Sequence, residues 1–242
     1  MAKRRASRRV VEDGNDGPNW LIIGGIAAVG MAVLLGLLAV TVTAGPSAPE
    51  PTPVLEENVV AIAEYCEANP DRCIAVGAED APVTLVEVSD YGCPHCRDFN
   101  ADSVPTLKSE YVDTGLVRWV IMPYALSDQT QASAVATLCA ADQGQEQALA
   151  FHEEMFKLQT TGDFNTAGGF SSVARNVGLD VDQFDQCVAA ETYDSQVHFN
   201  RQAARQAGVN STPTVFINGR MISGNVGLEI FSQRIEDALT EG

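Results

Sequence analysis

The sequence predicts an α/β domain that carries an inserted group of helices and is preceded by a single N-terminal transmembrane helix. Three observations predict this class. A long uncharged stretch lies near the N-terminus, and short apolar runs typical of strands alternate with longer helical patterns in the remainder. The length of 242 residues is enough for one full hydrophobic core with room for an insertion.

A basic segment precedes the uncharged stretch. Residues 1–19 contain the basic run Lys3–Arg9, and residues 20–42 have no charged side chain and are long enough to cross a bilayer. Because positive charge favours the cytoplasmic side, residues 1–19 are expected to form a cytoplasmic tail. We therefore expect a single-pass protein of the cell membrane with an extracytoplasmic main domain.

A cleaved signal peptide is the alternative to this anchor. Val42-Thr43-Ala44 before Gly45 resembles a small-residue cleavage site, but the apolar core of a signal peptide is usually only about 7–15 residues long. Residues 43–58 are rich in proline and are expected to form an extended linker between the membrane and the domain.

The first half of the domain follows the linker. Residues 59–79 are predicted to form a helical extension that contains two cysteines, and residues 80–127 form the first part of the α/β domain. That part begins with the strand Val83–Val88 and continues with a helix that Pro105 is expected to kink. The strand Leu116–Met122 completes it.

The second half begins with helices and returns to strands. Residues 128–207 are predicted to form the inserted helical domain, and residues 208–242 complete the α/β domain. An Asn-Gly pair between two strand-like runs is a strong hairpin signal. The elements expected there are the strands Thr214–Ile217 and Arg220–Ser223, joined by Asn218-Gly219, and the helix Leu228–Leu239.

The charge balance excludes one class of partner. The formal net charge is −17, and the acidic excess lies after the N-terminal basic segment. Nucleic-acid binding needs lysine and arginine to neutralise phosphates, so no nucleic-acid partner is expected.

Six cysteines in an exported chain indicate disulfides. Cys66 and Cys73 flank the turn signal Asn69-Pro70-Asp71, which folds the chain back and brings the two sulfurs within reach of each other. Cys139 and Cys187 both lie in helical patterns and are expected to join two helices. Two buried free thiols are the alternative for this second pair.

The remaining two cysteines form the motif Cys93-Pro94-His95-Cys96, directly after a strand and at the predicted start of a helix. The unpaired N–H groups and the dipole of a helix N-terminus stabilise a thiolate, so we expect the pKa of Cys93 to be low. Pro94 suits the first helical turn because it has no N–H to lose. His95 adds a donor or a positive charge beside the sulfur. Cys96, one turn further, is expected to be less exposed and to act as the resolving thiol.

A zinc site and a purely structural disulfide are the alternatives for this motif. The chain has no second C-x-x-C and no H-x-x-x-H, so no metal site is predicted. His152-Glu153-Glu154 resembles the start of a zinc-protease motif, but position 156 is Phe. We therefore expect His152 to lie on a solvated helical face. His198 is expected to be a surface or packed histidine. Gly168-Gly169 is expected to lie in a loop between inserted helices, and no phosphate-binding site is predicted there.

Two segments carry a resemblance to a known family. Glu87 to Cys96 and Ser211 to Gly219 resemble the DsbA-like branch of the thioredoxin superfamily, and the resemblance covers residues 80–242. It implies a thioredoxin fold with an inserted helical domain. It also implies a cis-proline at Pro213, where Thr212 exposes its backbone to pair with a substrate strand. A trans proline that begins an edge strand is the alternative.

The resemblance also implies a reaction and partners. Glu87 matches the buried acidic residue that assists proton transfer in the family. The implied enzyme is a protein thiol:disulfide oxidoreductase with no cofactor beyond the Cys93–Cys96 disulfide. Its substrates would be cysteine-containing exported proteins, and a quinone-linked membrane oxidase of the DsbB or vitamin-K-epoxide-reductase-like kind would reoxidise it.

The direction of the redox reaction stays open at this point. The chain departs from the best-known member in Thr212 before the proline, in its extra cysteines and in its membrane tether. A reductase or isomerase on the same scaffold is one alternative. A non-catalytic thioredoxin-like binding module is the other, and it predicts that Cys93→Ser leaves function intact.

Overall fold

The computed structural model describes residues 56–241. The predicted tail 1–19, the predicted span 20–42 and most of the predicted linker 43–58 lie outside the described residues. Among residues 56–241, no helix combines the length and the apolar character needed to cross a membrane.

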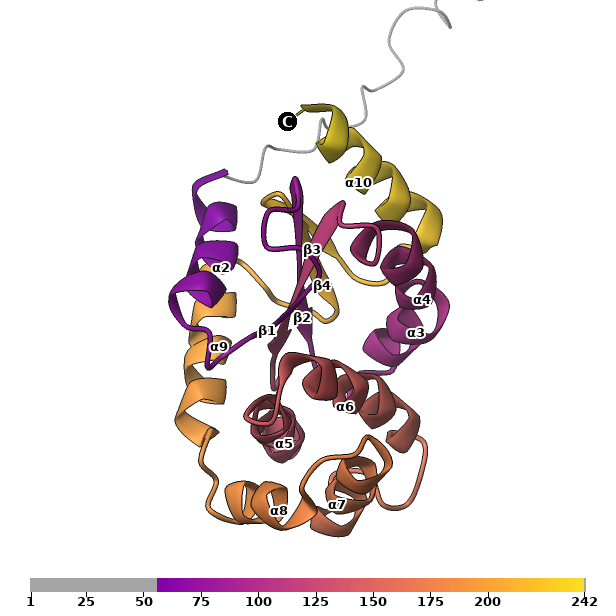
Figure 1. Ribbon diagram of the computed structural model, residues 1–242. Helices are drawn as coiled ribbons and strands as arrows, with labels where there is room; N and C mark the ends of the chain where they lie inside the picture. The colour runs from indigo at the N-terminus through magenta and orange to yellow at the C-terminus, as the bar shows by residue number, and fades with distance from the viewer. Residues whose placement is uncertain (1–55, 242) are drawn as a thin grey trace, which may run out of the picture. The chain divides into compact units, whose positions relative to one another are not determined.

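A five-stranded sheet forms the centre of the domain (Figure 1). The strand order is β1-β3-β2-β4-β5, with β2 parallel to β3 and all other neighbours antiparallel. Nearly every side chain of β2 is buried, which is expected for a central strand covered on both faces. The strands are β1 (Ile74–Val76), β2 (Val83–Ser89), β3 (Val117–Pro123), β4 (Thr214–Ile217) and β5 (Arg220–Ser223).

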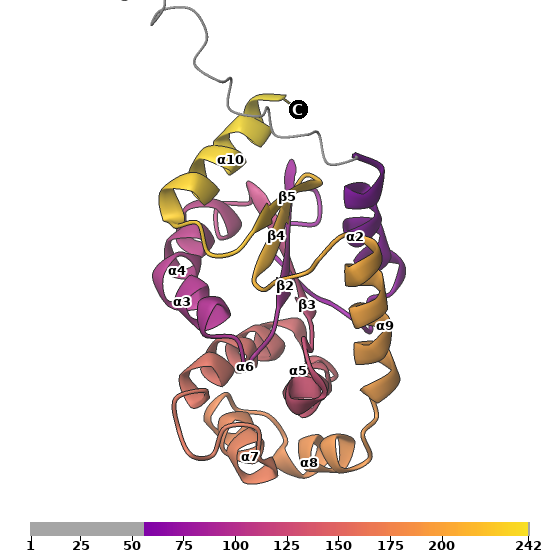
Figure 2. The same cartoon turned by 180° about the vertical axis from the view of Figure 1, so that it is seen from behind.

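Helices cover both faces of the sheet. Figures 1 and 2 show α2 (Glu56–Ala68) and α9 (Asp194–Gln206) on one side, and α3 (Pro94–Asp102), α4 (Val104–Leu107) and α10 (Leu228–Glu241) on the other. The alternation of side chains along β2 explains the two layers, because alternate residues of a strand point to opposite faces. Leu85 packs in the core that contains Phe99 and Phe231, whereas its neighbour Val86 packs in the core that contains Ile62.

The helix that Pro105 was expected to kink is interrupted at Ser103 and changes from α to π geometry at Lys108. The helix consists of α3 (Pro94–Asp102), α4 (Val104–Leu107) and a π-helical turn (Lys108–Val112). Pro105 lies at the start of α4, where it cannot donate a hydrogen bond back into α3. The interruption therefore follows from the missing N–H of this proline.

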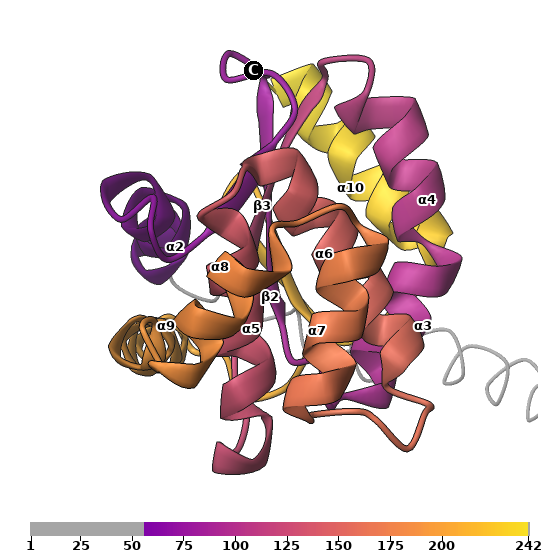
Figure 3. The same ribbon diagram turned by 60° about the horizontal axis from the view of Figure 1, so that its bottom comes forward.

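The predicted block 128–207 is helical along most of its length. It contains a short 3-10 turn (Asp128–Thr130), α5 (Gln131–Ala141), α6 (Gln145–Leu158), α7 (Ala167–Asn176), α8 (Val181–Ala189) and α9. Figure 3, which brings this end of the molecule forward, shows α5 to α8 in front of the sheet. The prediction of a loop at Gly168-Gly169 was wrong. Both residues lie in the first turn of α7, whose N-cap Thr166 accepts from the backbone N–H of Gly169.

The C-terminal hairpin has the predicted strand bounds. Asn218 and Gly219 both have positive φ, 41° and 89°, which is the backbone conformation that a tight two-residue turn between twisted strands requires. The last helix starts at the predicted residue and continues two residues beyond the predicted end, to Glu241.

The predicted helical extension 59–79 is helical only in its first part, and α2 already begins inside the predicted linker. After α2 the chain forms β1, which pairs antiparallel with β3 through Ile74 and Ile121. Three residues are too few to show a strand period, and their pairing partner lies far along the chain. The strand therefore depends on the sheet rather than on a local pattern.

Candidate active site

Cys93 lies where the chain passes from the central strand β2 into helix α3. It is the N-cap residue, with extended backbone angles (φ −81°, ψ 120°), and Pro94 occupies the start of the helix. The first N–H groups of a helix have no partner within the helix. These N–H groups are therefore available to the Cys93 sulfur. Pro94 has no N–H, but no hydrogen bond is lost because the N–H at this position would have no partner within the helix.

A buried carboxylate holds the loop before Cys93. Asp90 is 2% exposed. Its Oδ1 accepts from the backbone N–H of Gly92 at 2.7 Å, and its Oδ2 accepts from the backbone N–H of Leu126 at 2.5 Å and from the Thr130 hydroxyl at 2.8 Å. Asp90 thus connects the active-site loop to the segment after β3. Sequence analysis did not select this residue, although an Asp two residues before a Gly is a known turn signal.

The two active-site cysteines are thiols in this structure and differ in exposure. Cys93 is partly exposed, whereas Cys96 is fully buried. The pKa of Cys93 is lowered from 9.0 to about 5, chiefly by a hydrogen bond from the Cys96 thiol and against the opposing effect of burial. The Thr212 side chain and the backbone N–H groups of Cys96 and His95 also lower it. Burial raises the pKa of Cys96 well above its ordinary value, and the neighbouring Cys93 raises it further.

The site contains one acidic thiol and one that keeps its proton. Cys93 is therefore ionised at neutral pH and can attack or leave as a thiolate, while Cys96 stays protonated until a base takes its proton. The imidazole of His95 is exposed, and the contribution of His95 to the low pKa of Cys93 comes from its backbone N–H.

A second segment completes the site from the opposite end of the sequence. The Thr212–Pro213 peptide bond is cis, and both residues are buried directly before β4. In its thiol form Cys93 donates through Sγ to the carbonyl oxygen of Thr212 at 3.2 Å. The reactive sulfur and the backbone before the proline are therefore in contact.

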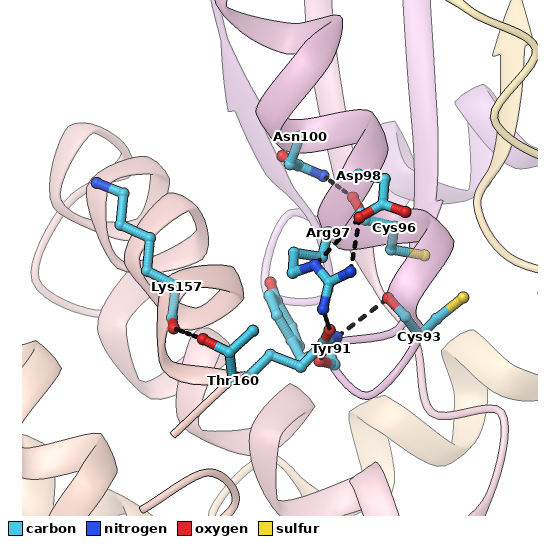
Figure 4. A network of polar contacts seen from close by, with 9 residues as sticks. Tyr91, Cys93, Cys96, Arg97, Asp98, Asn100, Lys157 and Thr160 are labelled. Atoms are coloured by element: carbon cyan, nitrogen blue, oxygen red, sulfur yellow. Dashed lines mark hydrogen bonds and ion pairs between the residues drawn. The ribbon is translucent and has the colours of Figure 1, made fainter.

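Glu87 is fully buried on β2, within the polar part of the core. Its Oε1 accepts from Asn100 Nδ2 at 2.9 Å. Asn100 also donates to the backbone carbonyl of Cys96 at 3.1 Å, and Figure 4 shows this second bond. Burial raises the pKa of Glu87 from 4.5 to about 7, while Asn100, Ser89 and Trp119 act in the opposite direction. The carboxyl group can therefore both accept and release a proton near neutral pH.

The prediction that His152 lies on a solvated helical face was wrong. The side chain is 0% exposed and contacts Asn100 and Tyr91. The expectation was based on Phe156, which occupies the position of the second metal ligand, and did not use the helical period, which indicates burial. The residues of α6 that face the core recur at helical spacing and include Ala148, Leu149, Phe151, His152, Met155 and Phe156. His198 is exposed on α9, as expected for a surface histidine.

A glutamine of the inserted domain contacts the active-site loop and was missed by the sequence analysis. Gln159, just after α6, donates through Nε2 to the carbonyl oxygens of Tyr91 at 2.6 Å and Cys93 at 3.0 Å. Its Oε1 accepts from Arg97 at 3.3 Å, and Arg97 also pairs with Asp98 at 2.8 Å (Figure 4). The position of this loop thus depends on helix α6.

The four outer cysteines form two disulfides, and the pairs are those that the sequence predicted. Cys66 is bonded to Cys73 next to α2, and Cys139 is bonded to Cys187 between α5 and α8. Both outer pairs are bonded in the structure in which Cys93 and Cys96 are thiols.

The fold and the site define a class of protein. An acidic, partly exposed thiol and a buried second thiol can form a mixed disulfide with another molecule and then resolve it. This arrangement is that of a protein thiol:disulfide oxidoreductase. A family model described as Thioredoxin matches residues 70–237, and the chain belongs to the thioredoxin family.

Relatives and solved structures agree with this assignment. Disulfide bond formation protein D of Bacillus subtilis is 27% identical over 68% of this chain and 76% of its own length. The crystal structure of oxidised BdbD from Bacillus subtilis superposes with a TM-score of 0.63 at 26% identity, over 69% of this chain and 92% of that chain. The Na(+)/H(+) antiporter NhaA 3 of Salinispora tropica is 31% identical over 70% of this chain, but the match covers 25% of that protein.

Proposed function

We propose that this chain is a membrane-anchored, extracytoplasmic enzyme that introduces disulfides into exported proteins through the Cys93–Cys96 pair. The observation that carries this proposal is the position of Cys93, a partly exposed thiol at the N-cap of α3 next to the buried Cys96, where its pKa is lowered to about 5. A stabilised thiolate is a good leaving group and favours the reduced form of the pair, which makes the disulfide an oxidant. Relatives named for disulfide bond formation support the same direction.

In the proposed cycle a substrate thiolate attacks Sγ of Cys93 in the disulfide form. The Cys93–Cys96 bond breaks, a mixed disulfide forms, and Cys96 leaves as a thiolate that takes a proton from Glu87. A second substrate thiolate then attacks the substrate sulfur of the mixed disulfide. The substrate disulfide forms, the Cys93 thiolate is released, and the two electrons of the substrate remain on the enzyme's dithiol.

We assign substrate positioning to Thr212 and Pro213. The contact between Cys93 Sγ and the Thr212 carbonyl at 3.2 Å supports this assignment, because a strand that pairs with Thr212 would bring its own cysteine next to the sulfur. The backbone of an extended substrate is recognised by this mode, so the enzyme accepts different exported proteins.

The anchor and the redox partner also belong to the proposal. Residues 20–42 would tether the domain outside the cytoplasm, with the N-terminus inside. No cofactor is needed beyond the Cys93–Cys96 disulfide, since a quinone-linked membrane oxidase of the DsbB or vitamin-K-epoxide-reductase-like kind would remove the electrons from the dithiol.

Oxidative refolding tests the proposed direction. The full chain in its disulfide form is mixed with a reduced, unfolded protein that needs disulfides for activity, and Cys93→Ser is the control. We expect the substrate protein to recover its activity with the native chain only. The reduction potential of the Cys93–Cys96 pair is expected to be about −120 mV. A potential near about −270 mV would make the chain a reductant, and full activity of Cys93→Ser would make it a binding module.

A further inference from the structure

Helix α6 of the inserted domain places a histidine next to the redox site. Nε2 of His152 lies 2.9 Å from Asn100 Oδ1, and its Nδ1 lies 2.8 Å from the Tyr91 hydroxyl. Asn100 in turn is bonded to Glu87. A continuous buried chain of hydrogen bonds therefore connects α6 to the carboxyl group on β2.

The direction of each bond in this chain follows from the chemistry of its groups. The amide nitrogen of Asn100 uses one hydrogen for Glu87 Oε1 and the other for the carbonyl of Cys96. Its oxygen can only accept, so we assign the hydrogen to Nε2 of His152. Nδ1 is then an acceptor, and the Tyr91 hydroxyl donates to it. Every polar atom of Asn100 and of His152 has a partner.

His152 acts through its orientation and not through its charge. Burial lowers its pKa to about 3, and the rings of Tyr91, Trp119 and Phe156 lie around it with centroids 5.1 to 5.9 Å away. The imidazole is therefore neutral wherever Cys93 is a thiolate. Its position between aromatic rings leaves the N–H little freedom to turn away from Asn100.

Glu87 is the group in this chain that titrates near neutral pH. Its Oε1 is bonded to Asn100, and Nε2 of His152 lies 3.9 Å from the same oxygen. Its other oxygen is buried without a hydrogen-bond partner among the described residues. The polar and titratable side chains around it come from α3, α6, β2, β3 and the active-site loop: Asn100, His152, Ser89, Trp119 and Tyr91. From β4, the apolar Val215 lies opposite Glu87.

We propose that His152 is a positioning residue of the redox reaction: through Asn100 it holds the Glu87 carboxyl group at the amide that is also bonded to the backbone of the resolving cysteine, so that the inserted domain controls the proton exchange of Cys96. The inference rests on the proposed role of Glu87 as the proton-exchange group. Asn100 is the shared contact, since one amide is bonded to both the carboxyl group and the backbone of Cys96.

The step affected is the closure of the active-site disulfide. The thiol of Cys96 gives its proton to the Glu87 carboxylate, and the resulting thiolate attacks Sγ of Cys93 in a mixed disulfide. The Cys93–Cys96 bond forms, and the partner's sulfur leaves as a thiolate. In the opposite direction the same carboxyl group returns the proton to Cys96.

Dithionitrobenzoate separates this step from the attack by Cys93. The reduced full chain releases one thionitrobenzoate when Cys93 attacks the reagent and a second when Cys96 closes the disulfide. We expect the rate of the second release to rise with pH through a midpoint near pH 7, the pKa of Glu87. Glu87→Gln removes the accepting group and is expected to remove this midpoint.

His152→Phe tests the inference. Without the imidazole, Asn100 loses its support and donates less well to the Glu87 carboxylate, so the pKa of Glu87 rises further. We expect the midpoint to move up by about one pH unit and the second release at pH 7 to slow about fivefold. His152→Gln keeps an N–H at the place of Nε2 and is expected to restore most of the rate. His198→Phe, at an exposed histidine of α9, is the matched control.

Asn100→Leu is a second variant that tests whether the hydrogen bond from Asn100 controls the pKa of Glu87. It removes the donor to Glu87 directly and is expected to raise the midpoint by a similar amount, even if His152→Phe does not fold. An unchanged midpoint in either folded variant would overturn the inference. Because the reagent reports disulfide closure whichever way the enzyme works on its substrates, this result is independent of the refolding test.

Discussion

At the level of single residues, the active-site loop depends on a close approach between Gly92 and Thr130. A Cβ atom on Gly92 would lie 2.4 Å from Cγ2 of Thr130. Thr130 cannot move away freely, because its hydroxyl donates to the buried carboxylate of Asp90. Glycine is therefore required before Cys93 for reasons of space.

Gly92→Ala is expected to destabilise the domain by about 1–3 kcal/mol, the usual cost of overpacking. Thr130→Ser removes the methyl group in the way and keeps the hydroxyl that bonds to Asp90. In that background Gly92→Ala should cost much less. Urea unfolding of the two single variants and the double variant measures the coupling. Equal costs of Gly92→Ala in both backgrounds would contradict this explanation.

The sequence predicted the positions of some site residues correctly, misplaced one and missed others. Cys93, Pro94 and Cys96 were located correctly at a helix start, because their motif is local. His152 was misplaced because its exposure was inferred from the missing metal ligand at position 156 and not from the helical period. Asn100 and Gln159 gave no chemical signal, although Asn100 follows Cys96 by one helical turn and so lies on the same face.

At the level of elements, the two outer disulfides close loops of very different length. Cys139–Cys187 joins α5 to α8 across a sequence separation of 48, and Cys66–Cys73 closes a separation of 7. A cross-link stabilises a fold mainly by restricting the unfolded chain, and the restriction grows with the loop. The long-range bond should therefore contribute more to the inserted domain than the short one contributes to α2 and β1.

Cys139→Ala/Cys187→Ala is expected to lower the free energy of unfolding by about 4 kcal/mol, and Cys66→Ala/Cys73→Ala by about 2 kcal/mol. Both double variants keep Cys93 and Cys96. Denaturant unfolding with the active-site pair held in one redox state makes the comparison. A larger loss for the short loop would show that local packing, and not chain entropy, determines the contribution of these bonds.

At the level of the whole molecule, stability and redox state are linked through Cys93. In the folded reduced protein its pKa is about 5, against an ordinary value of 9.0. A depressed pKa stabilises the folded reduced form fully above about pH 9, and this contribution is lost as the pH falls through about 5. The disulfide form has no such thiolate, and Glu87 is present in both forms.

The stability of the reduced form relative to the oxidised form should therefore increase between about pH 5 and pH 9. Thermal unfolding of both forms across this range measures the difference. The Cys93→Ser variant lacks this thiolate. Its stability should therefore show no such increase over the same pH range. A difference between the redox forms that does not depend on pH would mean that the Cys93 thiolate is not stabilised by the fold.

The sequence by itself determined four of the five strands, the last helix, the location of the reactive pair and the favoured pairing of the other cysteines. These features depend on patterns within a few residues, or on the spacing of a rare residue type. Only the tertiary structure decided that β1 joins the sheet, that Thr212 contacts Cys93, and that His152 reaches Glu87 through Asn100. Each of these contacts joins segments far apart in the chain, so packing of the whole domain is needed to bring the groups together and to remove the water that would otherwise surround them.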